Sequence, residues 1–89
     1  MAEFGILHAG TLVSAGAATL QLSTDSYLIE TVLIQNQTGG ATVSVGNSLV
    51  CPLELVAGAT LTLDIDRLDK IYIAFPAGGG RVNWLAGAK

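Results

Sequence analysis

One stretch of strict alternation, residues 60–66, constrains the fold more than any other part of this sequence. Leucine, leucine and isoleucine occupy positions 61, 63 and 65, and threonine or aspartate occupies each position around them. A period of two places Leu61, Leu63 and Ile65 on one face of a β-strand and the polar residues on the other. The pattern predicts a strand with one buried face and one wet face.

Other short apolar runs, separated by turn residues, extend this pattern along the chain. Strands are expected at residues 19–23, 27–35, 41–45, 60–65, 71–75 and 81–85, with a weaker signal around residues 10–13. The run 27–35 is nearly continuously apolar, which predicts a central strand buried on both faces. The sequence therefore predicts an all-β chain.

The segments between these strands carry turn and edge signals. Residues 36–40 and 76–80 are rich in turn formers, and each is expected to close a hairpin. Residues 49–55 include Pro52, which cannot donate to a ladder and belongs at a sheet edge or between strands; this segment is expected to cross between strands. Asp66 is expected to cap one helical or 3₁₀ turn over residues 66–70.

These elements together favour a small antiparallel β-sandwich or barrel of about seven to eight short strands. Residues 1–15 are expected to form an N-terminal arm or a first strand. Residues 16–89 are expected to form a single β-domain.

The composition indicates a partner or a second copy. Hydrophobic residues make up 51% of the 89 residues and charged residues only 12%, against a usual charged fraction of about 25%. A monomer of this size buries only about 60–65% of its unfolded surface. Either copies of the chain share apolar surface or the excess is alanine, which is tolerated on a surface.

The charge, the apolar runs and the cysteine content disfavour nucleic acid as a partner, a membrane location and secretion. The net charge is −3 with four cationic side chains, so nucleic acid is not an expected ligand. No apolar run approaches the ~20 residues of a membrane span, and the start of the chain lacks the basic residues of a secretory signal. The single cysteine, Cys51, agrees with folding in a reducing cytoplasm.

Candidate catalytic and metal-binding groups are few. His8 and Cys51 stand in different segments without motif context, so a nucleophile with its base is not expected. The spacing of Asp64, Asp66 and Asp69, with Asp25 elsewhere, lacks the glycine and terminal glutamate of a calcium loop. Residues 78–81 lack the ending of a phosphate loop and are expected to form a turn. We predict no enzyme, no metal and no cofactor.

One family resemblance runs through the last two thirds of the chain. It is carried by Pro52 and Leu53, residues 57–65, Leu68, residues 70–73, Gly79 and Gly80, Val82, and Trp84 and Leu85. This order resembles the C-terminal β-module of small tailed-bacteriophage head proteins, namely the capsid decoration (cement) proteins and head-fibre proteins.

The resemblance implies a structural virion protein that binds the outside of a phage capsid and stabilises it as an oligomer, expected to be a trimer. Its implied partners are the major capsid protein and itself, on a capsid assembled in the host cytoplasm. The alternative is a tail or surface-fibre module that recognises glycan through its aromatic residues. The candidate partner or oligomer contacts are Phe4, Ile6, Leu7, Leu12, Tyr72 and Trp84.

Overall fold

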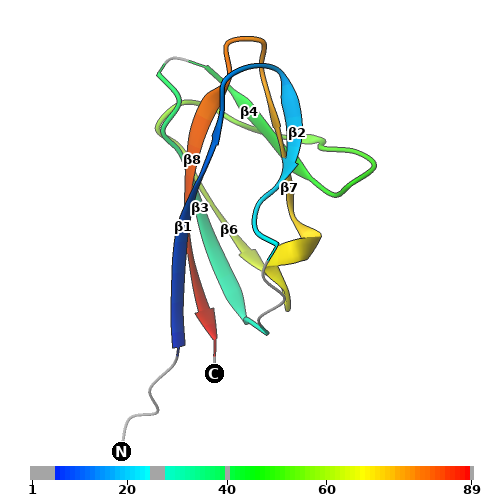
Figure 1. Cartoon of the computed structure of the whole chain (residues 1–89). Coiled ribbons are helices and arrows are strands. Elements are labelled where there is room, and N and C mark those ends of the chain that lie inside the picture. Colours follow the sequence, from blue (N-terminus) through cyan, green and yellow to red (C-terminus); the bar gives the residue numbers. More distant parts are fainter. Residues whose placement is uncertain (1–5, 25–27, 40, 89) are drawn as a thin grey trace, which may run out of the picture.

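Eight strands and one 3₁₀ turn make up the computed structural model of the chain, which describes residues 6–24, 28–39 and 41–88. Figure 1 shows the strands arranged in two layers. In chain order they are β1 (Ile6–Ser14), β2 (Ala18–Gln21), β3 (Thr31–Asn36), β4 (Val43–Gly46), β5 (Leu53–Leu55), β6 (Thr60–Asp64), η1 (Leu68–Lys70), β7 (Tyr72–Phe75) and β8 (Gly80–Ala88).

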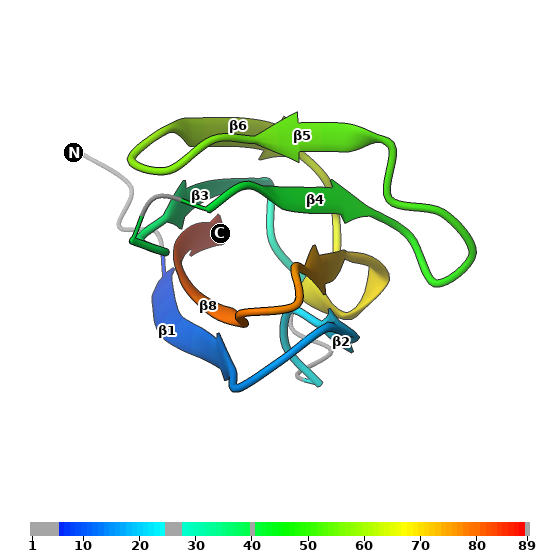
Figure 2. The ribbon, with the colours of Figure 1, turned by 90° about the horizontal axis from the view of Figure 1, so that it is seen from above.

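The strand pairings are nested inside one another. β1 pairs with β8, β2 with β7, β3 with β6 and β4 with β5, always antiparallel. The chain is therefore one long hairpin whose turn lies between β4 and β5. Figure 2 shows from above that β3 and β4 lie next to β6 and β5, whereas β1 and β2 lie at the opposite side of the molecule.

Two further pairings, β3 with β8 and β4 with β7, close this wrapped hairpin into two sheets. The first has the order β1-β8-β3-β6 and is called sheet A; the second has the order β2-β7-β4-β5 and is called sheet B. This order is that of an eight-stranded jelly roll. The predicted all-β antiparallel sandwich is confirmed.

Two predicted hairpins are wrong. Residues 36–40 and 76–80 join strands that lie in different sheets, β3 to β4 and β7 to β8. The expected crossing at residues 49–55 is also wrong, because this segment returns beside β4 as β5, at the sheet edge that Pro52 also allowed. Glycine and proline mark a change of chain direction, but they do not determine which sheet the next strand joins.

The prediction that residues 27–35 are buried on both faces is wrong. Val32 and Ile34 are fully buried, whereas Thr31 and Leu33 on the opposite face are exposed. β3 is central within sheet A, but a sandwich covers only one face of each sheet. Tyr27 lies outside the described residues.

The alternation in β6 is confirmed. Its leucines, with Ile65 beyond the strand, are partly buried and pack against the core, while Thr60, Thr62 and Asp64 are exposed. The core cluster of buried side chains between the sheets is Leu22, Ile29, Val32, Ile34, Val43, Val45, Leu55, Leu68, Ile71, Ile73, Phe75, Val82, Trp84 and Ala86.

The short turn η1 forms as expected, but its predicted cap is wrong. Arg67 occupies the N-cap position in an extended conformation and makes no capping hydrogen bond. Asp66 instead accepts a hydrogen bond of 2.8 Å from Nζ of Lys70. Leu68 is fully buried, so packing anchors this turn.

Asn36, placed in a turn by its sequence context, is the buried polar side chain that joins the two sheets. Its Nδ2 donates to the carbonyl oxygens of Ala41, at 2.9 Å, and Leu55, at 2.8 Å. Its Oδ1 accepts from the backbone N–H of Thr38 at 2.8 Å. Because Asn36 ends β3 and Leu55 ends β5, this one amide ties sheet A to sheet B.

Three glycines in loops differ in backbone conformation and in the space around an added Cβ. We therefore expect their alanine variants to lose different amounts of stability. Gly79 has a φ of +74° and an added Cβ would lie 2.1 Å from the carbonyl oxygen of Ser14; Gly58 has a φ of +81° with open space. Gly78 has neither constraint. Thermal or urea unfolding is expected to show that the free energy of unfolding falls by about 2–3 kcal/mol in Gly79→Ala. The expected fall is about 1 kcal/mol in Gly58→Ala and under about 0.5 kcal/mol in Gly78→Ala. Equal losses at all three positions would contradict the described loop geometry.

Candidate interaction surfaces

The acidic and cationic side chains around η1 neutralise one another. Arg67 donates from Nε to Asp69 at 3.1 Å and also pairs with it through Nη2. The hydrogen bond from Lys70 lowers the pKa of the exposed Asp66 carboxyl. Within the described ranges, no three His, Cys, Asp or Glu side chains are grouped so that they could hold a metal ion.

His8 and Cys51 are not brought together. His8 lies in β1 opposite Ala86, whereas Cys51 lies in the loop before β5. The sulfur of Cys51 lies 3.6 Å from the carbonyl oxygen of Asn47 and 3.6 Å from that of Tyr72, and either can accept its one weak S–H hydrogen bond. Burial raises the pKa of this thiol, which disfavours the nucleophilic thiolate at neutral pH.

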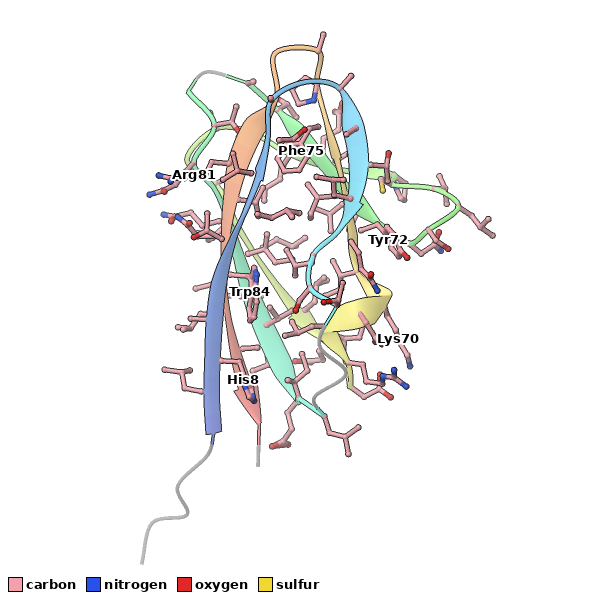
Figure 3. The ribbon with its side chains drawn as sticks, in the orientation of Figure 1. His8, Lys70, Tyr72, Phe75, Arg81 and Trp84 are labelled. Carbon is pink, nitrogen blue, oxygen red and sulfur yellow. The ribbon has the colours of Figure 1, made fainter. Side chains whose placement is uncertain are left out.

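The six predicted contact residues are distributed over surface and interior. Leu7 is 68% exposed on β1, and Tyr72 is half-buried on β7 (Figure 3). Leu12 packs against the core, and Trp84 is only 8% exposed. Phe4 lies outside the described residues, and Ile6 is described only as the first residue of β1.

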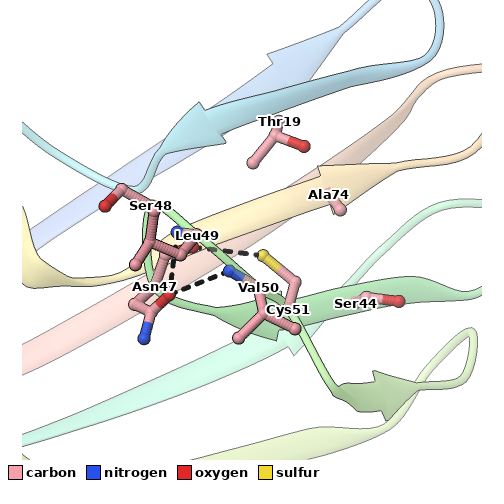
Figure 4. A pocket seen from close by; sticks show the side chains of 8 residues that line it. All are labelled: Thr19, Ser44, Asn47, Ser48, Leu49, Val50, Cys51 and Ala74. Atoms are coloured by element: carbon pink, nitrogen blue, oxygen red, sulfur yellow. Dashed lines mark hydrogen bonds between the residues drawn. The ribbon is translucent and has the colours of Figure 1, made fainter.

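The loop between β4 and β5 is held in shape by hydrogen bonds of Asn47 and exposes apolar side chains. Asn47 Oδ1 accepts from the backbone N–H groups of Leu49, at 2.8 Å, and Val50, at 2.9 Å. The N–H of Asn47 donates back to the carbonyl of Val50. Figure 4 shows this loop beside a pocket of about 240 Å³, whose wall includes Thr19 of β2 and Ala74 of β7. Leu49 is 92% exposed, so its side chain is held out towards solvent.

The outward face of sheet A is nearly free of charge. A polar row crosses it, in which Thr11 donates to Asn83 at 2.8 Å and Asn83 donates to Gln35 at 3.5 Å. Beside this row the register aligns Ala9, Leu85 and Leu33 in a neighbouring apolar row. Within the four strands, the outward residues are Leu7, Ala9, Thr11, Val13, Arg81, Asn83, Leu85, Gly87, Thr31, Leu33, Gln35, Thr60, Thr62 and Asp64.

Only Arg81 and Asp64 in that set carry charge, and the register places them at opposite ends of the sheet. An uncharged sheet face with exposed leucines is typical of a surface that another protein covers. We call this set of residues the sheet A outer face.

The four sheet edges differ in how they are protected. β2, β5 and β6 are short, with four, three and five residues, and the latter two carry Glu54 and Asp64. β1 is nine residues long and contains no charged residue and no proline. Long, uncharged edges are the ones that pair with other strands.

The open edge of β1 was not among the predicted sites, although the sequence contains a signal for it. No Asp, Glu, Lys or Arg occurs between Glu3 and Asp25. A long uncharged stretch that forms a strand leaves its edge without the charges that normally prevent pairing. The weak alternation of residues 6–14 predicted an arm or a first strand without indicating that this strand would lie at a sheet edge.

No protein-family model matches this chain, and a search of curated proteins gives no match to its sequence. Within the described residues, no helix is long and apolar enough to cross a membrane.

Proposed function

We propose that this protein is a structural component of a tailed-phage virion that binds the outside of the capsid and cements it as a homo-oligomer. Its partners in this proposal are the major capsid protein and further copies of itself. The resemblance described above supplies the family and the expected trimer. The observation that carries the proposal is the sheet A outer face, a broad surface for a protein partner on which only Arg81 and Asp64, at opposite ends, carry charge.

The jelly-roll fold is compatible with this function but does not determine it. Viral capsid proteins and lectins both use jelly rolls. The glycan alternative depends on the rings of Tyr72 and Trp84, of which Trp84 is buried in the core and Tyr72 is half-buried. This placement favours the capsid-binding proposal over glycan recognition.

Co-sedimentation tests the proposal. The protein is expected to pellet with undecorated shells of a major capsid protein encoded in the same genome, and Leu33→Glu is expected to lower the bound amount at least tenfold. Leu33 lies in the middle of the sheet A outer face, where a charge would be trapped against the shell. Sedimentation with washed shells measures the bound fraction.

Leu28→Glu is the matched control, because Leu28 is also exposed but lies outside that face. Equal binding by both variants would remove the sheet A outer face from the proposal. A wild-type chain that stays in the supernatant, together with a glycan-array signal, would replace the proposal with carbohydrate recognition.

A further inference from the structure

Only alternate residues of β1 form backbone hydrogen bonds with β8, and the hydrogen bonds of sheet A show which residues these are. The N–H of Gln37 donates to the carbonyl of Arg81, so the backbone groups of Arg81 face β3. Alternate residues of a strand face opposite neighbours, so Val82 faces β1, where the register sets it opposite Leu12. The even-numbered residues of β1 therefore bond to β8.

The odd-numbered residues of β1 point their N–H and C=O groups away from β8. β1 is the end strand of sheet A, so within residues 6–24, 28–39 and 41–88 no other strand pairs with these groups, and they form an open row at its edge. The same residues direct their side chains onto the sheet A outer face: Leu7, Ala9, Thr11 and Val13. An open row of this kind is a template for an additional strand.

This row is complementary to itself. Antiparallel pairing about a two-fold axis at Gly10 sets Leu7 opposite Val13 of the second copy and Ala9 opposite Thr11, and all four outward residues then bond. Such pairs exchange about eight hydrogen bonds in total. Leu7 is 68% and Val13 is 58% exposed, so the pairing would also bury two Leu–Val contacts.

Charge favours a second copy as the occupant. A charged edge strand that meets its own copy brings like charges together, which is destabilising. β1 contains none of Asp, Glu, Lys or Arg, so self-pairing carries no such penalty.

We propose that β1 pairs with β1 of a second copy in this register and joins the two four-stranded A sheets into one continuous sheet. The contact is two-fold and isologous. It also joins the two sheet A outer faces into a single surface with few charged residues. It is separate from the three-fold contact implied by the resemblance: alone it produces a dimer, and together with a three-fold contact it produces a hexamer.

Cross-linking tests the register in the absence of any capsid, so its outcome is independent of the proposed function. Leu7→Cys and Val13→Cys are combined in a Cys51→Ser background. The two positions are about 20 Å apart within one strand, which prevents an internal disulfide. The opposed residues of a bonded antiparallel pair are about 5.5 Å apart at Cα, which fits a disulfide. Mild oxidation is expected to convert more than about nine tenths of the double variant to covalent dimer.

Each single-cysteine variant is the matched control and is expected to remain uncross-linked. A double variant that stays monomeric on non-reducing gels, or singles that cross-link as fast as the double, would overturn the proposed register.

Ala9→Pro tests the pairing itself. The N–H of Ala9 points to the open edge, so proline removes a bond of the dimer and leaves the β1–β8 ladder intact. Sedimentation velocity is expected to show dimers or hexamers for the wild type and to show only odd-numbered species, monomer or trimer, for Ala9→Pro. A wild type that sediments as a monomer or trimer would overturn the proposal.

A second pair of variants distinguishes the loss of strand pairing from a folding defect in Ala9→Pro. Thr11→Lys adds an edge charge, and Thr62→Lys adds the same charge to the exposed face of β6 at the other edge. Thr11→Lys is expected to abolish the two-fold contact and Thr62→Lys to retain it. Retained dimers in Thr11→Lys would contradict the assignment of the contact to β1.

Discussion

Replacing Asn36 with leucine is expected to lower the free energy of unfolding by about 3–5 kcal/mol. The side-chain amide serves two carbonyl oxygens, those of Ala41 and Leu55, and the backbone N–H of Thr38. Leucine has a similar volume but leaves all three groups without this partner. A buried group that loses its hydrogen bond costs about 1–3 kcal/mol, and the contact with Leu55 is the most deeply buried of the three.

Urea unfolding, followed by the fluorescence of the single tryptophan, measures this loss. Asn83→Leu is the matched control, because Asn83 bonds to Thr11 and Gln35 on the sheet A outer face, where water can replace the amide. The control is expected to lose less than about 1 kcal/mol. Equal losses for the two variants would contradict the role of Asn36 as the link between the sheets.

Trp84→Ala is expected to destabilise the fold by a comparable amount, about 3–5 kcal/mol. The indole is 8% exposed and lies under Gly10, where an added Cβ would be 2.7 Å from Cζ2 of the ring. Removing the ring leaves a cavity between β1 and the core. Because the variant has no tryptophan, thermal unfolding followed by far-ultraviolet circular dichroism measures the loss.

The contact with Gly10 supplies an independent check on this placement. Gly10→Ala alone is expected to cost about 1–3 kcal/mol by overpacking, and the cost is expected to shrink when Trp84→Phe is also present. Contacting residues give non-additive double-mutant cycles. Additive losses, or a stable Trp84→Ala variant that has lost a binding activity, would return Trp84 to the role of a partner contact.

The fold class is predictable from this sequence because it depends on local patterns. The alternation at Leu61, Leu63 and Ile65 reports directly which side of a strand is buried, and the polar residues between them agree. Breaks between such runs mark strand ends. These signals are sufficient for an all-β sandwich or barrel, and the strand pairings decide between the two.

Strand pairing is not predictable in the same way, because it is non-local. β1 meets β8 across almost the whole chain, and nothing within residues 76–80 distinguishes a hairpin from a passage between sheets. The apolar run before Gln35 suggested burial on both faces, but exposed Leu33 instead belongs to the sheet A outer face. Apolar residues of a partner surface and of a core look alike in sequence.

The candidate contact residues show the same contrast between local sequence pattern and non-local strand pairing. Exposed Leu7 was identified from its apolar character in a weakly patterned segment, whereas Trp84 has the same apolar character and lies inside. Only the register shows that Leu7 shares an edge with Val13 and a face with Leu33 and Leu85. Position in the sheet therefore determines which apolar residues can meet a partner.

The most direct test of a cement function is the thermal stability of the shell itself. Undecorated shells are heated with and without saturating protein, and their disassembly is followed by calorimetry and light scattering. The proposal predicts that the protein raises the disassembly temperature until the binding sites are filled, because a ligand that binds only the assembled state stabilises it. An unchanged disassembly temperature at saturating protein would contradict the proposal.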